Sequence, residues 1–398
     1  MIIFCEECGT QHEFPEDGPE GQRGLLTCEG CHETLKVPCT SSSSIAGPSQ
    51  EPVRLLIVDD SRLIRKAVRR LFESDGQVQV VGEAAHGREA LDLLPQLKPD
   101  VITLDINMPI MDGLSTLKHI MIKHPTPTVM FSALTKEGAT ETFDALRLGA
   151  IDFMPKPSQS KGDDVTEQER LILQKVKIAA GIKTGAIRLL RTSRPEGRED
   201  RTLSTKPEGI VILGASEGGY GALLKVIPQL PSDLPAAYLV VQYAESEHIA
   251  KFADYLNANS AIQVKRAMQG DLVMPGTCYL ASGSEYTTLQ ADSGRITLQV
   301  NPSPFPERRG AINMLMLSVS ETMPQQAIGI VLTGKGTDGA EGAAEIRRVG
   351  GTVILQAPRT CLFQEMVQAT MRTGKADHVC SDQEIATAIK TAFGYQTN

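Results

Sequence analysis

The chain has 398 residues, more than one hydrophobic core usually holds, so we expect two to three domains. A formal net charge of −8 and the absence of tryptophan argue against nucleic-acid binding, which needs clustered Lys and Arg and aromatic stacking platforms. No run reaches the roughly 20 apolar residues of a membrane helix, and the acidic, cysteine-bearing N-terminus is unlike a signal peptide. Spaced cysteines favour a reducing compartment. We therefore expect a cytoplasmic protein without membrane insertion.

The first 38 residues contain two C-x-x-C pairs, Cys5 with Cys8 and Cys28 with Cys31. Each pair would chelate one edge of a tetrahedral zinc ion, so the doubled motif is typical of a structural four-thiolate site. A segment so short and so poor in apolar residues cannot fold on burial alone, and metal binding would supply the folding free energy. We predict a zinc ribbon over residues 1–38. The alternatives are a chance spacing and a redox pair.

A Ser- and Pro-rich stretch, residues 39–52, has the composition of a flexible tether. Residues 53–157 then alternate amphipathic helices with apolar strands, which we expect at VRLLIVDD, VQVVGEA, PDVITLDI, PTVMFSA and AIDFMPKP. Such alternation with short connections predicts a parallel, doubly wound α/β sheet of the flavodoxin-like type. Residues 158–208 are charged and mixed, with helical periodicity over 166–192. We interpret this span as an interdomain linker that contains a helix.

Residues 209–398 form a second α/β unit, for which we predict a Rossmann-type parallel sheet. The expected strands cover 209–215, 237–242, 277–281, 327–333 and 351–356. Two further apolar segments flank Asp292, Ser293 and Gly294, which predicts a β-hairpin at that point.

Acidic side chains stand at the ends of two predicted strands of the first unit, Asp59 and Asp60 after one and Asp105 after another. The carboxyl ends of parallel strands are where ligands bind in such sheets. Three carboxylates would repel unless a cation lay between them, and an all-oxygen ligand set suits Mg²⁺. With Ser132 and Lys156 at two more strand ends, the groups that stabilise a transferring phosphoryl are complete. The alternative is that these aspartates only cap helices.

Residues 53–157 resemble the receiver domain of two-component response regulators along their whole length. The pattern DxxMPxMDG, which begins at Asp105, is matched in full. The resemblance implies that Asp105 accepts a phosphoryl group and that a sensor histidine kinase of chemotaxis type is a partner.

The same resemblance gives roles to the residues around Asp105. It implies that Mg²⁺ is held by the carboxylates of Asp60 and Asp105 and the carbonyl of Asn107, with Asp59 assisting. It further implies contacts from Ser132 and Lys156 to the phosphoryl oxygens, and a switch role for the aromatic ring of Phe153.

A G-x-S-x-G sequence, residues 214–218, lies between an apolar strand and a helix. It would present Ser216 on a tight turn, with backbone N–H groups nearby to stabilise an oxyanion. The pattern alone is weak, since a glycine-rich turn can be only a turn. A later strand leads into a glycine-rich loop that carries Asp338, and another strand ends at residue 243. The three would form a Ser-His-Asp site if residue 243 were histidine, but it is Tyr243.

Residues 209 to about 380 resemble the chemotaxis protein-glutamate methylesterases, which are also glutamine deamidases. The motifs that carry the resemblance are GASEGGYGAL, VVQYAESEHIAKFADYL, GDLVMPGTCYLASG, VLTGKGTDGAEG and MRTGKADHV. The resemblance implies that Ser216 is the nucleophile, that Asp338 orients the base, and that methylated glutamates of chemoreceptors are the substrates. The family pattern has its histidine base where this chain has Tyr243.

Five positions around the expected cleft depart from the family pattern. They are Glu217 for threonine, Tyr243 for histidine, Tyr286 for histidine, Asn313 for aspartate and Lys335 for methionine. A phenol with a pKa of about 10 is a poor base near neutral pH. Two rescues stay open: His248 as the base, or a tyrosinate at Tyr243 whose pKa Lys335 lowers. The sequence thus leaves two hypotheses, a phosphorylation-gated methylesterase and a weakened or inactive domain that binds receptors or the kinase.

Overall fold

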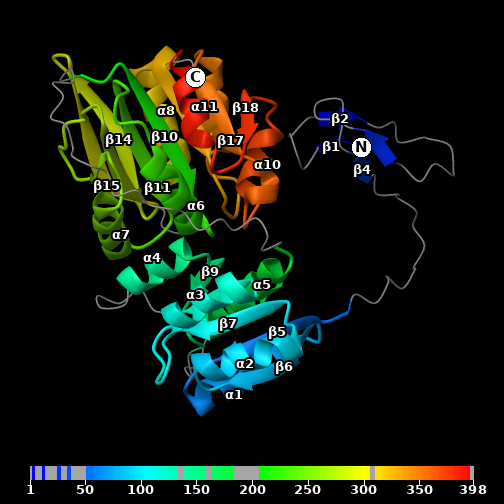
Figure 1. The fold of residues 1–398 in the computed structure, drawn as a ribbon. Helices are drawn as coiled ribbons and strands as arrows, with labels where there is room; N and C mark the ends of the chain where they lie inside the picture. The colour runs from blue at the N-terminus through cyan, green and yellow to red at the C-terminus, as the bar shows by residue number, and fades with distance from the viewer. Residues whose placement is uncertain are drawn as a thin grey trace. The chain divides into compact units, whose positions relative to one another are not determined.

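The structure is a computed structural model that describes residues 51–132, 139–157, 163–182, 206–304 and 310–394, together with four short strands in the first 50 residues. The chain divides into two compact units, residues 47–193 on the one hand and residues 1–46 with 194–398 on the other. Figure 1 shows a parallel sheet with packed helices in each of the two α/β parts. None of the helices in the described ranges combines the length and the apolar character of a transmembrane span.

The four strands of the first 50 residues form two antiparallel pairs. Strand β1 (Ile2–Phe4) pairs with β2 (Gln11–Glu13), and β3 (Leu25–Thr27) pairs with β4 (Thr34–Lys36). Each C-x-x-C pair falls in the sequence between the two strands of one pair. The cysteines themselves lie outside the described residues, so the zinc ribbon stays a prediction.

A five-stranded parallel sheet forms the centre of the first α/β unit, in the order β6-β5-β7-β8-β9. Its strands are β5 (Val53–Val58), β6 (Val78–Ala84), β7 (Val101–Asp105), β8 (Thr128–Phe131) and β9 (Asp152–Met154). All five strands lie where the apolar segments predicted them, and the flavodoxin-like order confirms the expected fold class. The β7 strand is buried along its whole length, as a central parallel strand with helices on both faces should be.

Five helices cover this sheet. They are α1 (Arg62–Glu73), α2 (Gly87–Leu97), α3 (Gly113–Lys123), α4 (Ala139–Arg147) and α5 (Asp163–Ala180). Helices α1 and α5 contact each other, and α3 contacts both α2 and α4, so the two groups cover opposite faces.

The position of α5 corrects the interpretation of residues 158–208 as a linker. Its Ile172, Val176 and Ala179 are fully buried in one cluster with Leu55 and Ile57 of β5. These residues are spaced so that they lie on one face of the helix, and that face packs beside α1 on the apolar surface of the sheet. The helix ends at Ala180, well before the predicted residue 192, and residues 183–205 lie outside the described ranges.

The second α/β unit is built on a seven-stranded sheet in the order β12-β13-β11-β10-β16-β17-β18, with every pair parallel. Its strands are β10 (Gly209–Ala215), β11 (Ala236–Gln242), β12 (Gln263–Arg266), β13 (Thr277–Ser282), β16 (Ala327–Val331), β17 (Thr352–Gln356) and β18 (His378–Cys380). The five predicted strands are confirmed. The sequence did not indicate the short edge strands β12 and β18.

Within the described residues of this unit, six helices and three 3₁₀ turns lie between or after these strands. They are α6 (Gly219–Val226), η2 (Ile227–Gln229), α7 (Ser246–Ala258), α8 (Ala311–Thr322), η3 (Pro324–Gln326), α9 (Ala340–Arg348), η4 (Pro358–Thr360), α10 (Glu365–Met371) and α11 (Ile385–Ala392). Helix α9 contacts both α8 and α10. The apolar residues of these three helices share one core with β10, β11 and β16.

The predicted hairpin is present as β14 (Glu285–Asp292) paired antiparallel with β15 (Arg295–Pro302). Its two turn residues, Ser293 and Gly294, have φ angles of 48° and 80°. Two successive positive φ values are those of a type I′ turn, whose twist matches that of the flanking strands.

Candidate functional site

Both parallel sheets have a point at which the strand order changes direction. In the first sheet β5 lies between β6 and β7, and in the second β10 lies between β11 and β16. In parallel sheets of this class, ligands generally bind beyond the carboxyl ends of the strands at such a point. The residues that the sequence singles out gather at these two points, and each group is described in turn.

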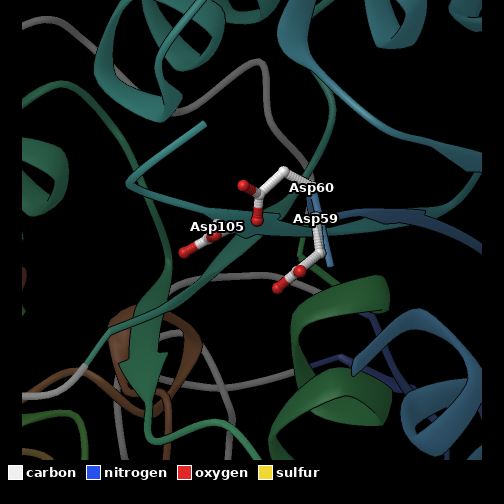
Figure 2. Close-up of side chains that lie close together, drawn as sticks. All are labelled: Asp59, Asp60 and Asp105. Atoms are coloured by element: carbon white, nitrogen blue, oxygen red, sulfur yellow. The ribbon is translucent and has the colours of Figure 1, made fainter. Parts of the chain in front are cut away.

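Three aspartates meet at the carboxyl edge of the first sheet. Asp59 and Asp60 follow β5, Asp105 ends β7, and carboxylate oxygens of the three lie within 4.8 Å of one another. Figure 2 shows their side chains gathered at this edge. Asp59 and Asp105 are 0% and 3% exposed, whereas Asp60 is exposed. The sequence prediction that these groups lie close together is therefore correct.

Lys156, which follows β9, supplies a cation to this cluster. Its Nζ lies 2.9 Å from Asp59 Oδ2 and 2.7 Å from Asp105 Oδ2. Burial raises the pKa of Asp105, and the hydrogen bond and charge of Lys156 offset this only in part. Burial lowers the pKa of Lys156, but the bonds to Asp105 and Asp59 outweigh it and the net shift is upward. One ammonium thus serves two buried carboxylates, and the cluster retains excess negative charge.

The donor set of this cluster fits the predicted Mg²⁺. It consists of anionic oxygens alone, which hard divalent cations prefer, and the exposed Asp60 leaves one side open to water. The backbone N–H of Asn107 donates to the Asp105 carboxylate, so the Asn107 residue lies beside the cluster. A bound Mg²⁺ would offset the repulsion between the carboxylates and the charge of a phosphoryl group.

Helix capping accounts for only part of this arrangement. The Ser61 Oγ accepts from the Ile64 N–H at the start of α1, and Asp59 Oδ1 accepts from the Ser61 N–H at 2.8 Å. At α3 the cap is Asp112, which accepts from the Ser115 N–H. Asp105 caps no helix and is held by Lys156 instead, so the capping alternative does not explain its burial.

The two other predicted switch residues lie on the neighbouring strand ends. Ser132 follows β8, and its Oγ is 2.6 Å from Thr142 Oγ1 on α4. Phe153 lies in β9 and is half-buried. The sequence analysis missed Lys175 of α5, whose Nζ donates to the Phe153 carbonyl at 3.0 Å and pairs with Asp152 at 2.6 Å. Its placement depended on α5, which the linker interpretation had removed from this unit.

Ser216 occupies the corresponding point of the second sheet, in the turn between β10 and α6. Its N–H donates to the Thr333 carbonyl at 3.1 Å and its carbonyl accepts from Gln242 Nε2 at 2.9 Å. Gly218 has a φ of +76°, which a side chain would disfavour, and it closes the turn into α6. These contacts tie Ser216 to the ends of β16 and β11, and the residue is 1% exposed.

Tyr243, which follows β11, is bound to Asp338 rather than set free as a base. Its Oη donates to Asp338 Oδ2 at 2.6 Å and accepts from the Ala311 N–H at 3.1 Å. Burial raises the pKa of Tyr243, and the charge of Asp338 raises it further. The phenol is therefore neutral at physiological pH, which contradicts the tyrosinate alternative.

The carboxylate of Asp338 is anchored at the start of α8. Its Oδ2 accepts from the Ile312 N–H and its Oδ1 from the Asn313 N–H, both at 3.0 Å. A carboxylate at a helix N-terminus is stabilised by the helix dipole and by unpaired N–H groups. The Asn313 side chain in turn accepts from the Gly339 and Gly342 N–H groups at the start of α9. Tyr243 and Asp338 thus belong to a network that fixes two helix ends.

A different carboxylate contacts the serine. Ser216 Oγ donates a hydrogen bond to Glu217 Oε2, and the backbone N–H of Lys335 donates to the same Oγ at 3.3 Å. The Lys335 ammonium lies 5.2 Å from the centre of the Phe363 ring. The sequence analysis noted Glu217 only as a departure from the family pattern, although a carboxylate next to the serine was itself a signal.

The two remaining positions do not supply a base at the end of β11. His248 lies in the first turn of α7, which rules out the end of the strand as its position. Tyr286 lies in β14 and packs, half-buried, against the core of the second sheet.

Comparison with known proteins assigns both α/β units. Residues 55–163 match the response regulator receiver domain family, and residues 211–389 match the CheB methylesterase family. The protein-glutamate methylesterase/protein-glutamine glutaminase of Symbiobacterium thermophilum is 40% identical over 361 residues, which cover 87% of this chain and 98% of that protein. The protein of the same name from Pyrococcus horikoshii is 36% identical, with 85% and 93% covered.

A crystal structure of the Thermotoga maritima CheB methylesterase catalytic domain is 31% identical, covers 46% of this chain and 96% of that domain, and has a TM-score of 0.44. The full-length relatives match this chain across both α/β units at 36–40% identity. The chain therefore belongs to the protein-glutamate methylesterase family, whose members join a response regulator receiver domain to a CheB methylesterase domain.

Proposed function

We propose that the chain is a chemotaxis response regulator whose receiver domain is phosphorylated on Asp105, and that phosphorylation controls the methylesterase domain. The observation that carries this proposal is the position of Lys156 between Asp59 and Asp105 at the switch point of the sheet. A carboxylate nucleophile, a cation and an all-oxygen metal site are what phosphoryl transfer to an aspartate requires. The phosphoryl donor in this proposal is a sensor histidine kinase.

We propose roles for the neighbouring residues that agree with the resemblance to receiver domains. Asp60, Asp105 and the Asn107 carbonyl would hold Mg²⁺, with Asp59 assisting. Lys156 and the Ser132 hydroxyl would contact the phosphoryl oxygens, and Phe153 would respond as the switch ring. Phosphorylation would then act on the methylesterase domain by shifting the population of two states of the chain.

Acetyl phosphate with Mg²⁺ tests the receiver proposal. The wild-type chain should take up one phosphoryl group, and Asp105→Asn should take up none. Asp92→Asn is the matched control, because Asp92 is an exposed aspartate on α2 in the same unit. Labelling is read by intact mass and by acid-stable trapping with borohydride. Equal labelling of the wild type and Asp105→Asn would rule out Asp105 as the acceptor.

For the second domain we propose hydrolysis of glutamyl methyl esters on chemoreceptors and deamidation of glutamine, the activities in the names of the relatives. The support from this chain is Ser216, held on a strand-to-helix turn at the switch point of the sheet and hydrogen-bonded to a carboxylate. A serine so placed can form an acyl intermediate when a neighbouring group takes its proton.

One observation favours a second candidate, a domain that binds receptors or the kinase without hydrolysis. Tyr243 stands at the strand end where a triad base would lie, and its hydroxyl is committed to Asp338 and to the Ala311 N–H. Loss of a triad base lowers the turnover of serine hydrolases by orders of magnitude when nothing replaces it.

Methanol release from methylated chemoreceptor separates the two candidates. The phosphorylated wild-type chain should release methanol at a rate that Ser216→Ala abolishes. A rate equal to that of Ser216→Ala, with receptor binding retained, would establish the binding module instead. Phosphorylation by acetyl phosphate should raise the rate, and Asp105→Asn should remove that increase.

We also propose a zinc ribbon over residues 1–38, with Cys5, Cys8, Cys28 and Cys31 as ligands, which would offer an additional interaction surface. The support is that each C-x-x-C pair falls in the sequence between the two strands of one antiparallel pair. The purified chain should contain one zinc per molecule by plasma mass spectrometry. Cys5→Ser with Cys8→Ser should lose it, whereas Cys380→Ser, on β18, should retain it.

A further inference from the structure

We propose that Glu217 is a catalytic residue of the second domain, the general base that accepts the proton of Ser216. This inference rests on the hydrolytic function proposed above. The carboxylate of Glu217 already accepts a hydrogen bond from Ser216 Oγ. A general base must lie within hydrogen-bond reach of the proton that it removes, and Glu217 meets that condition.

The imidazoles of this domain do not offer an alternative. Residues 206–394 contain two histidines, His248 and His378. His248 lies in α7, and His378 lies in β18, three strands away from β10. Neighbouring strands are about 4.8 Å apart, so His378 stands on the order of 14 Å from the strand that carries Ser216.

The phenol at the strand end is excluded on chemical grounds. A general base must be able to accept a proton, whereas the Tyr243 hydroxyl already carries one and donates it in the hydrogen bond to Asp338. Burial and the contact with Asp338 raise the pKa of Tyr243, and they outweigh the hydrogen bond from the Ala311 N–H, which favours the phenolate. A carboxylate, by contrast, has lone pairs that can accept a proton, and the Glu217 carboxyl already accepts a hydrogen bond from Ser216 Oγ.

The surroundings of Ser216 strengthen its bond to Glu217. Ser216 is 1% exposed and Glu217 is half-buried, so little water competes for the hydrogen bond. The Lys335 N–H donates to Ser216 Oγ, and the Gln242 side chain holds the Ser216 carbonyl. The serine is therefore fixed on several sides while its proton points to the carboxylate. Because Ser216 is so buried, an ester reaches it only after neighbouring side chains move, and the test uses the phosphorylated chain.

The proposed step is balanced in atoms and charge. Ser216 Oγ forms a bond to the ester carbonyl carbon while its proton passes to the Glu217 carboxylate, which gives a tetrahedral oxyanion. The Glu217 carboxylic acid returns that proton to the departing methoxide, so methanol leaves and an acyl-serine remains. Water then attacks the acyl carbon, Glu217 takes its proton, and the proton returns to Ser216 Oγ as the glutamate product leaves.

Covalent labelling of Ser216 with a fluorophosphonate tests the base directly, because the reagent needs the activated serine but no acyl hydrolysis. The full chain, phosphorylated with acetyl phosphate, is labelled between pH 4 and 8, and the adduct on Ser216 is quantified by peptide mass. The labelling rate should rise through about pH 4–5, the range of a carboxylic acid, and then stay level. A rise centred near pH 6.5 would indicate an imidazole base and overturn the proposal.

Glu217→Gln keeps the shape of the side chain and removes the base. It should lower the labelling rate by roughly 10²-fold or more and abolish the rise with pH. Glu341→Gln is the matched control, because Glu341 is an exposed glutamate in the first turn of α9. Glu217→Asp keeps a carboxylate, so it should retain the pH profile at a lower rate. This variant decides the matter should Glu217→Gln fold poorly.

Two results would overturn the proposal in different ways. Labelling of Glu217→Gln at or above the wild-type rate would mean that Glu217 covers the serine instead of activating it. No labelling of wild-type Ser216 would mean that the serine is not activated at all. Methanol release distinguishes failure of this inference from failure of the proposed function. Hydrolysis that needs Ser216 but not Glu217 contradicts only the role of Glu217. Absence of hydrolysis contradicts both that role and the proposed hydrolytic function.

Discussion

At the switch point of the first sheet, two buried carboxylates share the single ammonium of Lys156. At the switch point of the second sheet, a phenol and a carboxylate satisfy each other, and Tyr243 donates to Asp338 while Asp338 accepts from the start of α8. The first site carries more negative charge than its own cation offsets, so a bound metal cation would relieve the repulsion between its carboxylates. At the second site, a tyrosine that keeps its proton stands where the family pattern has a histidine, which can accept and release a proton.

The difference shows that equivalent positions in two parallel sheets can hold side chains with different chemical functions. Strand order alone brings side chains together at the carboxyl ends of the strands, and it does so in both units. The function of those side chains depends on whether neighbouring groups neutralise their charges and satisfy their hydrogen bonds. Three experiments test this difference.

The largest effect on stability is expected in the second sheet. Tyr243→Phe removes the hydroxyl and leaves Asp338 and the Ala311 N–H each without one partner, which should lower the free energy of unfolding by about 1–2 kcal/mol. Because Tyr243 does not serve as the base, labelling of Ser216 should change by less than about threefold in rate. Calorimetry on the full chain measures the first effect and fluorophosphonate labelling the second. Loss of labelling in a stably folded Tyr243→Phe would place the phenol in the reaction.

A somewhat smaller effect is expected from Mg²⁺ in the first sheet. At ten times its dissociation constant, a cation that binds only the folded state stabilises it by about 1.4 kcal/mol. The calorimetric transition of the receiver domain should move upward in Mg²⁺, whereas Asp60→Asn should respond much less. The transition of the second sheet serves as the internal control. An equal shift of both transitions would point to a general salt effect.

The smallest effect is the release of charge repulsion by Asp105→Asn in metal-free buffer. Burial raises the pKa of Asp105 above its ordinary 3.8, so the folded state holds a proton in a pH window where the unfolded state has released it. Stability therefore falls as the pH rises through that window. Asp105→Asn should match the wild type in acid, below that window, and exceed it in stability at neutral pH. A variant less stable than the wild type at pH 7 would mean that the bond to Lys156 outweighs burial.

The sequence was sufficient to predict the core strands of both sheets, because continuous apolar runs and strand-end aspartates are local features. The hairpin at Ser293 and Gly294 was predictable for the same reason, since turn chemistry resides in two residues. The edge strands β12 and β18 were missed because they are short and mixed in polarity, and their pairing partners are distant in sequence. Helix α5 was assigned to a linker because its periodicity does not say which surface it covers.

The candidate sites divide in a similar way. The approach of Asp59, Asp60 and Asp105 follows from strand order, and so does the approach of residue 243 to Asp338. The direction in which a hydroxyl points does not follow from it. Whether Tyr243 faces Asp338 or Ser216, and whether Glu217 turns toward the serine, depends on hydrogen bonds among loops that the pattern cannot order.

The bond between Ser132 and Thr142 has a consequence for how a signal leaves the receiver. Either hydroxyl can be the donor of the 2.6 Å hydrogen bond between Ser132 and Thr142. Where Ser132 is the donor, the proton that a phosphoryl oxygen on Asp105 would attract is the one in that bond. Thr142 belongs to α4 and is fully buried, so this helix and the phosphoryl group would compete for one small donor. Phosphorylation would in that case remove one hydrogen bond between α4 and the end of β8.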